Sequence, residues 1–227
     1  MFSIKTPSIY FLIIVLLAGT AGVQASPTQT QQNERKMVIT IDDLPSVGAK
    51  TLQDKQHITD ALLASFKNYG VPAIGFVNEK KLGKTAPKPH NIALLKQWVD
   101  AGMELGNHTY SHPKFYDTPL EDYKQEVITG ERVTKTLFTP ETHKPRYFRH
   151  PYLNTGPELA TRLEFERFLS QHNYRVAPVT IDNSEWIYSK AYNKAKAAND
   201  SALMQKIGND YVQYICLLYT SPSPRDA

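Results

Sequence analysis

Cysteine is nearly absent from this chain of 227 residues, with Cys216 as the single example. One cysteine cannot close an intramolecular disulfide or build a thiolate zinc site. Clustered positive charge is lacking too: the net charge is only +4, and Lys and Arg are scattered. A nucleic-acid-binding surface is therefore not indicated. The apolar stretch from Ile9 to Ala18 is too short for a comfortable transmembrane span.

The N-terminal end has the pattern of a secretory signal peptide over residues 1–25. Lys5 precedes the apolar stretch, and Val23-Gln24-Ala25 supplies small residues at a cleavage site before Ser26. Residues 26–36 are polar and are predicted to form a flexible leader. We therefore expect the mature protein to be periplasmic or secreted, with no transmembrane segment after cleavage.

The C-terminal residues 216–227 follow an amphipathic pattern abruptly. They resemble a translated sequencing-adapter read-through, which would place the end of the native sequence near Ile215 and make Cys216 an artefact. The alternative is a genuine Pro/Ser-rich tail. The expected domain is 37–215, truncated at its C-terminus, with 216–227 as a non-native tail.

Strand and helix patterns alternate along the domain. Apolar strands are predicted at 37–43, 73–77, 103–107, 146–149 and 175–181, with helical periodicity after each of them. This alternation predicts an α/β fold with a parallel sheet or barrel flanked by helices. In such folds functional residues lie at the carboxyl ends of the strands.

The helix after the third strand is predicted to begin with a capping box, Thr118-Pro119-Leu120-Glu121. Its apolar stripe would run from Tyr123 to Leu137. Gly130 within this stripe destabilises a helix, and we expect it to permit close packing on the sheet.

Two adjacent carboxylates, Asp42 and Asp43, end the first strand. Neighbouring strand residues normally point to opposite faces, but both can face one cleft where strand geometry breaks down. The pair is consistent with a metal ligand beside a general base, or with a turn before Leu44-Pro45.

Similar candidates follow the third, fourth and fifth strands. His108 and His112 have the spacing to meet one metal in a tight turn, although His is also an ordinary surface residue. Arg149 is a natural partner for one of the carboxylates, and Pro151 would fix the backbone at Tyr152 so that its amide can point at a substrate oxygen. The alternative is a surface Arg and a core Tyr.

After the fifth strand, Asp182 could orient an Arg or a His, and Trp186 offers a flat apolar wall for a sugar, although Trp is more often a core residue.

Taken together and in this order, the motifs resemble the NodB-homology polysaccharide deacetylases, carbohydrate esterase family 4. The resemblance covers Met37 to Trp186. Thr40-Ile41-Asp42-Asp43 matches the family's Thr-Phe-Asp-Asp with one substitution, and residues 108–112 fit its His-[Ser/Thr]-x-x-His. It implies a distorted (β/α) barrel, incomplete here at the C-terminus, and a hydrolase that removes N-acetyl groups from an amino-sugar polymer such as peptidoglycan or a chitin-like glycan.

The resemblance also implies residue roles. Asp43, His108 and His112 would bind a divalent metal, most readily Zn²⁺, and Asp42 would be the general base. Arg149 would hold Asp42, and the Tyr152 amide after Pro151 would stabilise the oxyanion. Asp182 would orient a catalytic histidine, and Trp186 would line the sugar groove.

One family motif is missing: no histidine follows Trp186, whereas the family has a late Leu-x-His that supplies the general acid. Truncation accounts for this absence, and none of His57, His90, His143, His150 and His172 is assigned that role. Two alternatives therefore stay open. One is a carbohydrate- or metal-binding protein without activity, and the other is an O-acetyl esterase on the same scaffold.

Overall fold

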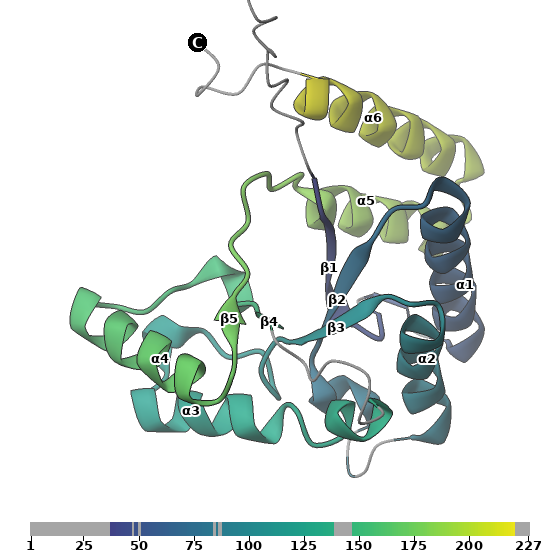
Figure 1. Ribbon diagram of the computed structural model, residues 1–227. Coiled ribbons are helices and arrows are strands. Elements are labelled where there is room, and N and C mark those ends of the chain that lie inside the picture. The colour runs from purple at the N-terminus through teal and green to yellow at the C-terminus, as the bar shows by residue number, and fades with distance from the viewer. Residues whose placement is uncertain are drawn as a thin grey trace, which may run out of the picture. The chain divides into compact units, whose positions relative to one another are not determined.

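The computed structural model describes residues 37–46, 48–49, 51–83, 85, 88–138 and 147–220. The predicted signal peptide and leader lie outside these residues. Five strands form one parallel sheet in chain order: β1 (Ile39–Leu44), β2 (Ala73–Val77), β3 (Glu104–Asn107), β4 (Tyr147–Phe148) and β5 (Arg175–Val176). Sequential parallel strands are the arrangement of a (β/α) barrel. Over the described residues the sheet stays open, with β1 and β5 at its edges (Figure 1), which confirms the predicted α/β class.

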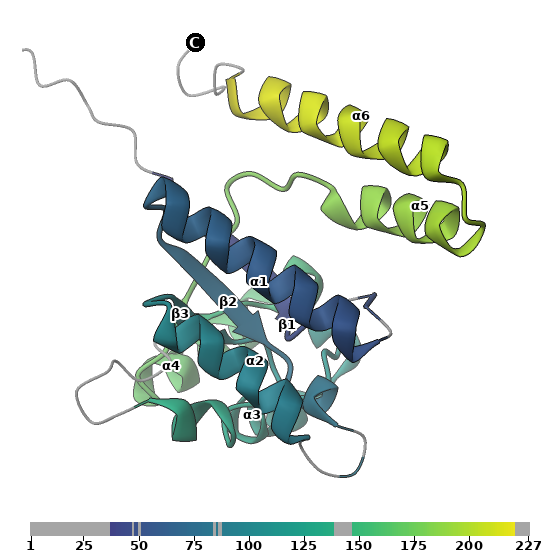
Figure 2. The same cartoon turned by 90° about the vertical axis from the view of Figure 1, so that its right-hand side faces the viewer.

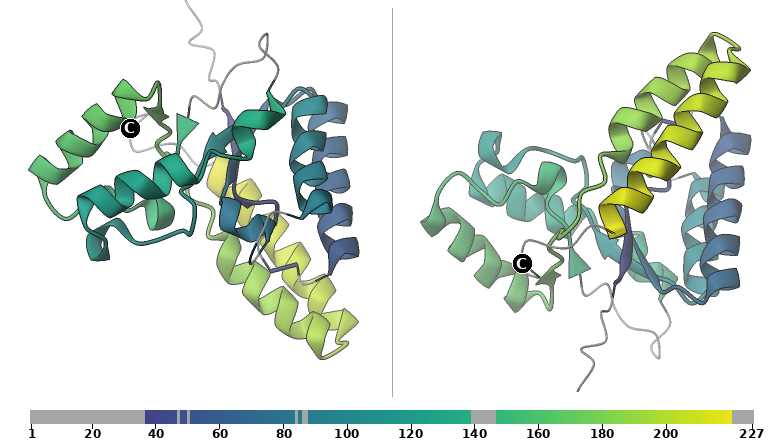
Figure 3. Two further views of the ribbon diagram at one scale, coloured as in Figure 1. Left: turned by 90° about the horizontal axis from the view of Figure 1, so that it is seen from below. Right: turned by 90° about the horizontal axis from the view of Figure 1, so that it is seen from above.

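The helices beside the sheet form two groups, one next to its first three strands and one next to its last two. Figures 1 and 2 show α1 (Leu52–Tyr69) and α2 (Pro89–Asp100) beside β1 to β3, while α3 (Leu120–Thr129) and α4 (Leu159–Gln171) accompany β4 and β5. An antiparallel pair, α5 (Glu185–Ala197) and α6 (Ser201–Thr220), follows (Figure 3). Short 3₁₀ helices are η1 (Glu79–Leu82), η2 (Phe115–Asp117), η3 (Thr134–Leu137) and η4 (Pro151–Leu153). No helix in the described part of the chain has both the length and the apolar character needed to cross a membrane.

Two apolar clusters hold these layers together. The first joins the strands to α1 and α2, and it includes Phe66, Val77, Leu95, Trp98 and Leu105. The second joins β4 to α3 and α4 through Phe115, Tyr123, Phe148, Phe165 and Leu169, all at most 1% exposed. Burying such side chains is the main favourable contribution to folding. The carboxyl ends of the strands are thereby fixed between the two clusters.

The predicted capping box on α3 is wrong. The Thr118 hydroxyl donates to the Lys114 carbonyl instead of capping the helix, and α3 ends at Thr129, so Leu137 belongs to η3. Gly130 does permit a close approach, but not to the sheet. A Cβ there would lie 2.6 Å from the Thr109 carbonyl carbon, in the segment that follows β3.

The fifth strand is much shorter than predicted, because β5 ends at Val176 and α5 begins at Glu185. β5 pairs with β4 over only two residues, and the last ladder bond runs from the Ala177 amide to the Phe148 carbonyl. Pro178 has no amide proton to continue the ladder. The Ala177 carbonyl accepts from Arg149 Nε at 2.8 Å, so a side chain replaces the next backbone partner.

Candidate active site

A bulge at the end of β1 turns both aspartates toward the same place. The pairing with β2 shifts between Ile41 and Leu44, and Asp43 has φ 70°, a left-handed conformation that Asp tolerates better than most residues. As a result, Asp42 Oδ2 and Asp43 Oδ1 both lie 4.0 Å from His108 Nε2. The breakdown of regular strand geometry expected from the sequence is therefore present here.

The two histidines come from the segment directly after β3. Thr109 and His112 have φ values of 66° and 63°, which curl this segment so that the two imidazole rings lie 4.9 Å apart. His108 Nδ1 lies 2.7 Å from the Arg149 carbonyl. A carbonyl can only accept, so Nδ1 carries the proton and Nε2 presents its lone pair toward Asp43.

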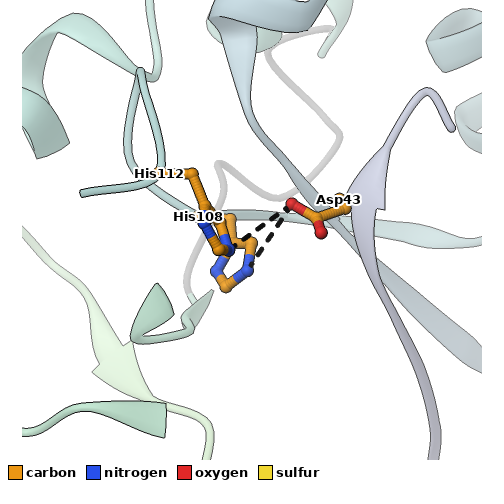
Figure 4. A group of neighbouring side chains, drawn as sticks. All are labelled: Asp43, His108 and His112. Atoms are coloured by element: carbon orange, nitrogen blue, oxygen red, sulfur yellow. Dashed lines mark ion pairs between the residues drawn. The ribbon is translucent and has the colours of Figure 1, made fainter. Parts of the chain in front are cut away.

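Three side chains converge at one point, as Figure 4 shows. Asp43 Oδ1 lies 3.6 Å from His112 Nε2 and 4.0 Å from His108 Nε2. One ligand atom from each of the three residues lies within 4.8 Å of the others. Burial lowers the pKa of His108 to about 4 and also lowers that of His112, so both imidazoles are neutral near pH 7. This donor set of two neutral imidazoles and one carboxylate fits a zinc ion with open coordination positions.

The α3 helix holds the histidine segment in place. Asn107 donates from Nδ2 to the Val127 carbonyl at 2.9 Å, and its Oδ1 accepts from the Thr109 amide at 2.8 Å. The Glu126 carboxylate accepts from the amide and hydroxyl of Ser111 at 2.6 and 2.9 Å. The contacts with α3 join residues 15 and 20 positions apart, and the sequence analysis did not identify them.

Arg149 contacts Asp42, the carboxylate that the family resemblance assigned to it. Its Nη1 lies 3.3 and 3.2 Å from the two carboxylate oxygens of Asp42, and its Nη2 lies 3.3 Å from the Thr40 hydroxyl. Arg149 is 3% exposed, and its guanidinium lies over the Phe76 ring. Burial raises the pKa of Asp42, an effect that Arg149 opposes and the neighbouring Asp43 reinforces.

Tyr152, together with Pro151 in η4, lies at the rim of this cluster. Its φ is 56°, which is uncommon for a bulky residue and typical of strained functional segments. The Tyr152 ring lies 4.5 Å from the His112 ring, and the Lys114 ammonium lies over it, 5.7 Å from the ring centre. Tyr152 is nevertheless 60% exposed, so much of the residue is accessible to a ligand. Pro151 is buried beneath it.

The structure does not bring Asp182 and Trp186 against the histidines. Asp182 Oδ1 accepts from the Ser184 amide, and Trp186 is 63% exposed at the start of α5. Glu185, between them in sequence, was not singled out. Its pKa is raised by burial and by the charges of Asp43 and Asp42, which places it in the electrostatic field of the cluster.

Four of the remaining histidines lie in the described residues, away from the metal-ligand cluster. His150 is 4% exposed and packs among the rings of Phe115, Tyr123 and Phe165. His172 Nδ1 bonds to the Phe168 carbonyl, and His57 and His90 line a cavity between α1 and α2. His143 lies outside the described residues. The general-acid role therefore stays unassigned.

Lys81 is a contact that the sequence reading missed. Its ammonium lies 2.6 Å from Asp43 Oδ1. Lys81 follows β2, the one strand whose carboxyl end was not inspected for functional residues. The same strand-end rule would have identified it.

Several known proteins are similar to this chain in sequence or in fold. The family model described as polysaccharide deacetylase matches residues 29–168. A peptidoglycan-N-acetylglucosamine deacetylase from Bacillus cereus is 25% identical over 190 residues, covering 84% of this chain and 58% of the relative. One from Listeria monocytogenes is 20% identical over 171 residues, covering 75% of this chain and 31% of the relative. The chain thus spans between about a third and three-fifths of the length of these relatives.

Among solved structures, a carbohydrate esterase family 4 pseudoenzyme from Bacillus anthracis aligns with a TM-score of 0.51 and 18% identity, covering 78% of this chain and 62% of that one. A peptidoglycan N-acetylglucosamine deacetylase aligns with a TM-score of 0.50 and 20% identity, covering 69% and 64%. At these identities the structural likeness concerns the fold. Since the family model spans more than half of the sequence, the chain belongs to the polysaccharide deacetylase family.

Proposed function

We propose that this protein is a metal-dependent hydrolase that removes N-acetyl groups from an amino-sugar polymer, with peptidoglycan the favoured substrate class. One observation carries the proposal: Asp43, His108 and His112 converge on one point, and Asp42 lies beside them under Arg149. The substrate class is supported by the relatives, which are named for peptidoglycan deacetylation.

Each side chain of the cluster has a distinct role in this proposal. A bound divalent ion, Zn²⁺ by its donor set, would act as a Lewis acid on the acetyl carbonyl and lower the pKa of water. Asp42 accepts the proton of the attacking water, and burial raises its pKa toward that of a useful base. Arg149 holds the Asp42 carboxylate in place from both oxygens. The exposed Tyr152 ring, beside His112, offers a face on which a sugar ring can lie.

A periplasmic or secreted location completes the proposal. It rests on the signal-peptide pattern of residues 1–25, and it would place the protein in the compartment where a cell-wall glycan is accessible.

The test is acetate release by the full chain from N-acetylated chitooligosaccharides and from peptidoglycan glycan strands. Wild type should release acetate only when a divalent metal is supplied. Asp42→Asn should lose this activity while its metal content, measured by elemental analysis, stays at the wild-type level. Asp60→Asn is the matched control, because Asp60 lies on α1 and bonds only to Gln56 among the contacts seen. Acetate release by Asp42→Asn at the wild-type rate would refute the role of Asp42 as base.

A second candidate function is a carbohydrate-binding protein that keeps the site without catalysis. One observation favours it: the two histidines that contact the carboxylates in the described residues, His108 and His112, are both needed for the metal, which leaves neither of them to protonate the leaving amine. Such a protein would bind chitooligosaccharides in calorimetry and release no acetate. An O-acetyl esterase is separated from both by comparing ester with amide substrates, since an alkoxide leaves with less protonation than an amine.

A further inference from the structure

We propose that in the metal-free protein the Lys81 ammonium supplies the positive charge beside Asp43 that a metal ion would otherwise supply. Lys81 must then leave Asp43 before an ion binds. This inference rests on the metal site proposed above. The Lys81 ammonium lies 2.6 Å from Asp43 Oδ1, the same oxygen that faces His112 Nε2 at 3.6 Å and His108 Nε2 at 4.0 Å. An ammonium and a divalent ion cannot both approach one carboxylate oxygen closely without strong repulsion.

The backbone around Lys81 is anchored, so this contact is built into the fold. Glu79, at the start of η1, is 3% exposed, and its carboxylate accepts from the amides of Val133 and Thr134 and from the Thr134 hydroxyl. The Lys80 amide donates to the Tyr110 carbonyl, within the histidine segment. Lys81 is therefore attached to the same rigid part of the molecule as the two imidazoles.

The charges of the site explain why a cation lies against Asp43. Arg149 compensates Asp42, which leaves Asp43 as the second carboxylate of the bulge to be compensated. The Lys81 and Asp43 side chains are 33% and 21% exposed, so water screens their interaction only in part. Lysine has a long flexible stem and can swing into solvent when an ion takes its position, whereas the planar guanidinium of Arg149 is bonded on several sides.

The experiment compares Lys81→Met with wild type in the full chain, using Co²⁺ and Zn²⁺ titration by calorimetry and thermal unfolding with and without chelator. Losing the competing ammonium should tighten metal binding roughly two- to fivefold, in line with a partly exposed ion pair. The metal-free variant should melt at a lower temperature than metal-free wild type, while the metal-loaded proteins should melt alike. Lys80→Met is the matched control, because Lys80 is exposed on the same short helix and should leave both readouts unchanged.

The outcomes separate this inference from the proposed function. Wild type that binds no divalent ion would refute the metal site itself. Wild type that binds, together with a Lys81→Met variant that binds equally or more weakly, would refute the role of Lys81 alone. If Lys81→Met does not fold without metal, Lys81→Arg provides the test. This variant keeps the positive charge, so it should bind the ion no more tightly than wild type. Tighter binding by Lys81→Arg would overturn the inference.

Discussion

Replacing His150 with phenylalanine should make the protein less sensitive to acid. His150 is 4% exposed and surrounded by aromatic rings, and its Nδ1 has no hydrogen-bond partner in the described structure. Burial, reinforced by the charge of Arg162, lowers its pKa from 6.5 to about 4. The folded protein therefore resists protonation of this ring, whereas the unfolded chain takes up the proton near the ordinary pKa.

The sign and size of the effect follow from this difference. Between pH 6.5 and about 4 the unfolded chain binds more protons than the folded protein, so stability rises with pH and is lost as the pH falls. Each tenfold difference in proton affinity corresponds to about 1.4 kcal/mol, which gives about 3 kcal/mol in full and about 2 kcal/mol between pH 7 and pH 5. Phenylalanine removes this penalty and fits the aromatic surroundings.

Urea unfolding at pH 7 and pH 5, in the presence of a chelator, measures the effect. Wild type should lose more stability between these pH values than His150→Phe, by about 2 kcal/mol. A residual loss should remain in the variant, because burial also lowers the pKa of His108 to about 4. His172→Phe is the control at an exposed histidine on the same side of the fold and should behave as wild type. An equal loss in His150→Phe and wild type would refute the reasoning.

Two further substitutions test the supports of the site. Arg149→Lys keeps the charge but cannot reproduce the contacts with Asp42, Thr40 and Ala177. Acetate release should therefore fall at least tenfold, and the free energy of unfolding measured in urea should fall by about 1–3 kcal/mol. Unchanged activity would contradict the positioning of Asp42 by the guanidinium. Gly130→Ala places a Cβ 2.6 Å from the Thr109 carbonyl carbon and should cost about 1–3 kcal/mol of stability and weaken metal binding in the calorimeter. Gly208→Ala, where an added Cβ meets nothing within 4 Å, should cost nothing.

The strand-end rule predicted the centre of the site well, because parallel strands bring their carboxyl ends to one edge. The rule directed attention to the two aspartates and the two histidines, and the family resemblance then selected Asp43, His108 and His112 as the metal ligands. Charge predicted that Arg149 pairs with one of the two carboxylates, since a buried carboxylate pair needs a cation, and the family resemblance selected Asp42. These inferences depend on local sequence pattern and on topology.

What could not be predicted depends on contacts between distant residues. The length of β5 is limited by an open sheet edge, by Pro178 and by the side chain of Arg149, which donates a hydrogen bond to the Ala177 carbonyl. The apolar periodicity of residues 175–181 gives no information about these three causes. The carboxylate of Glu79 looks like a surface charge in the sequence, yet it is buried against amides more than fifty residues away. Lys81 is a different case, because it follows the carboxyl end of β2 and the strand-end rule would have identified it.

The two aspartates of β1 are adjacent in sequence, share one bulge and lie equally far from His108, but only Asp43 also lies 3.6 Å from His112. The cations opposite the two carboxylates add a second difference between them. Asp42 faces a buried guanidinium bonded to Ala177 and Thr40, which stays in place and keeps this carboxylate available for a proton. Asp43 faces a lysine that is one-third exposed and can be exchanged for an ion. In the proposed function, the fixed cation would keep Asp42 ionised and ready to accept a proton, and the exchangeable cation would let a metal ion take its place at Asp43.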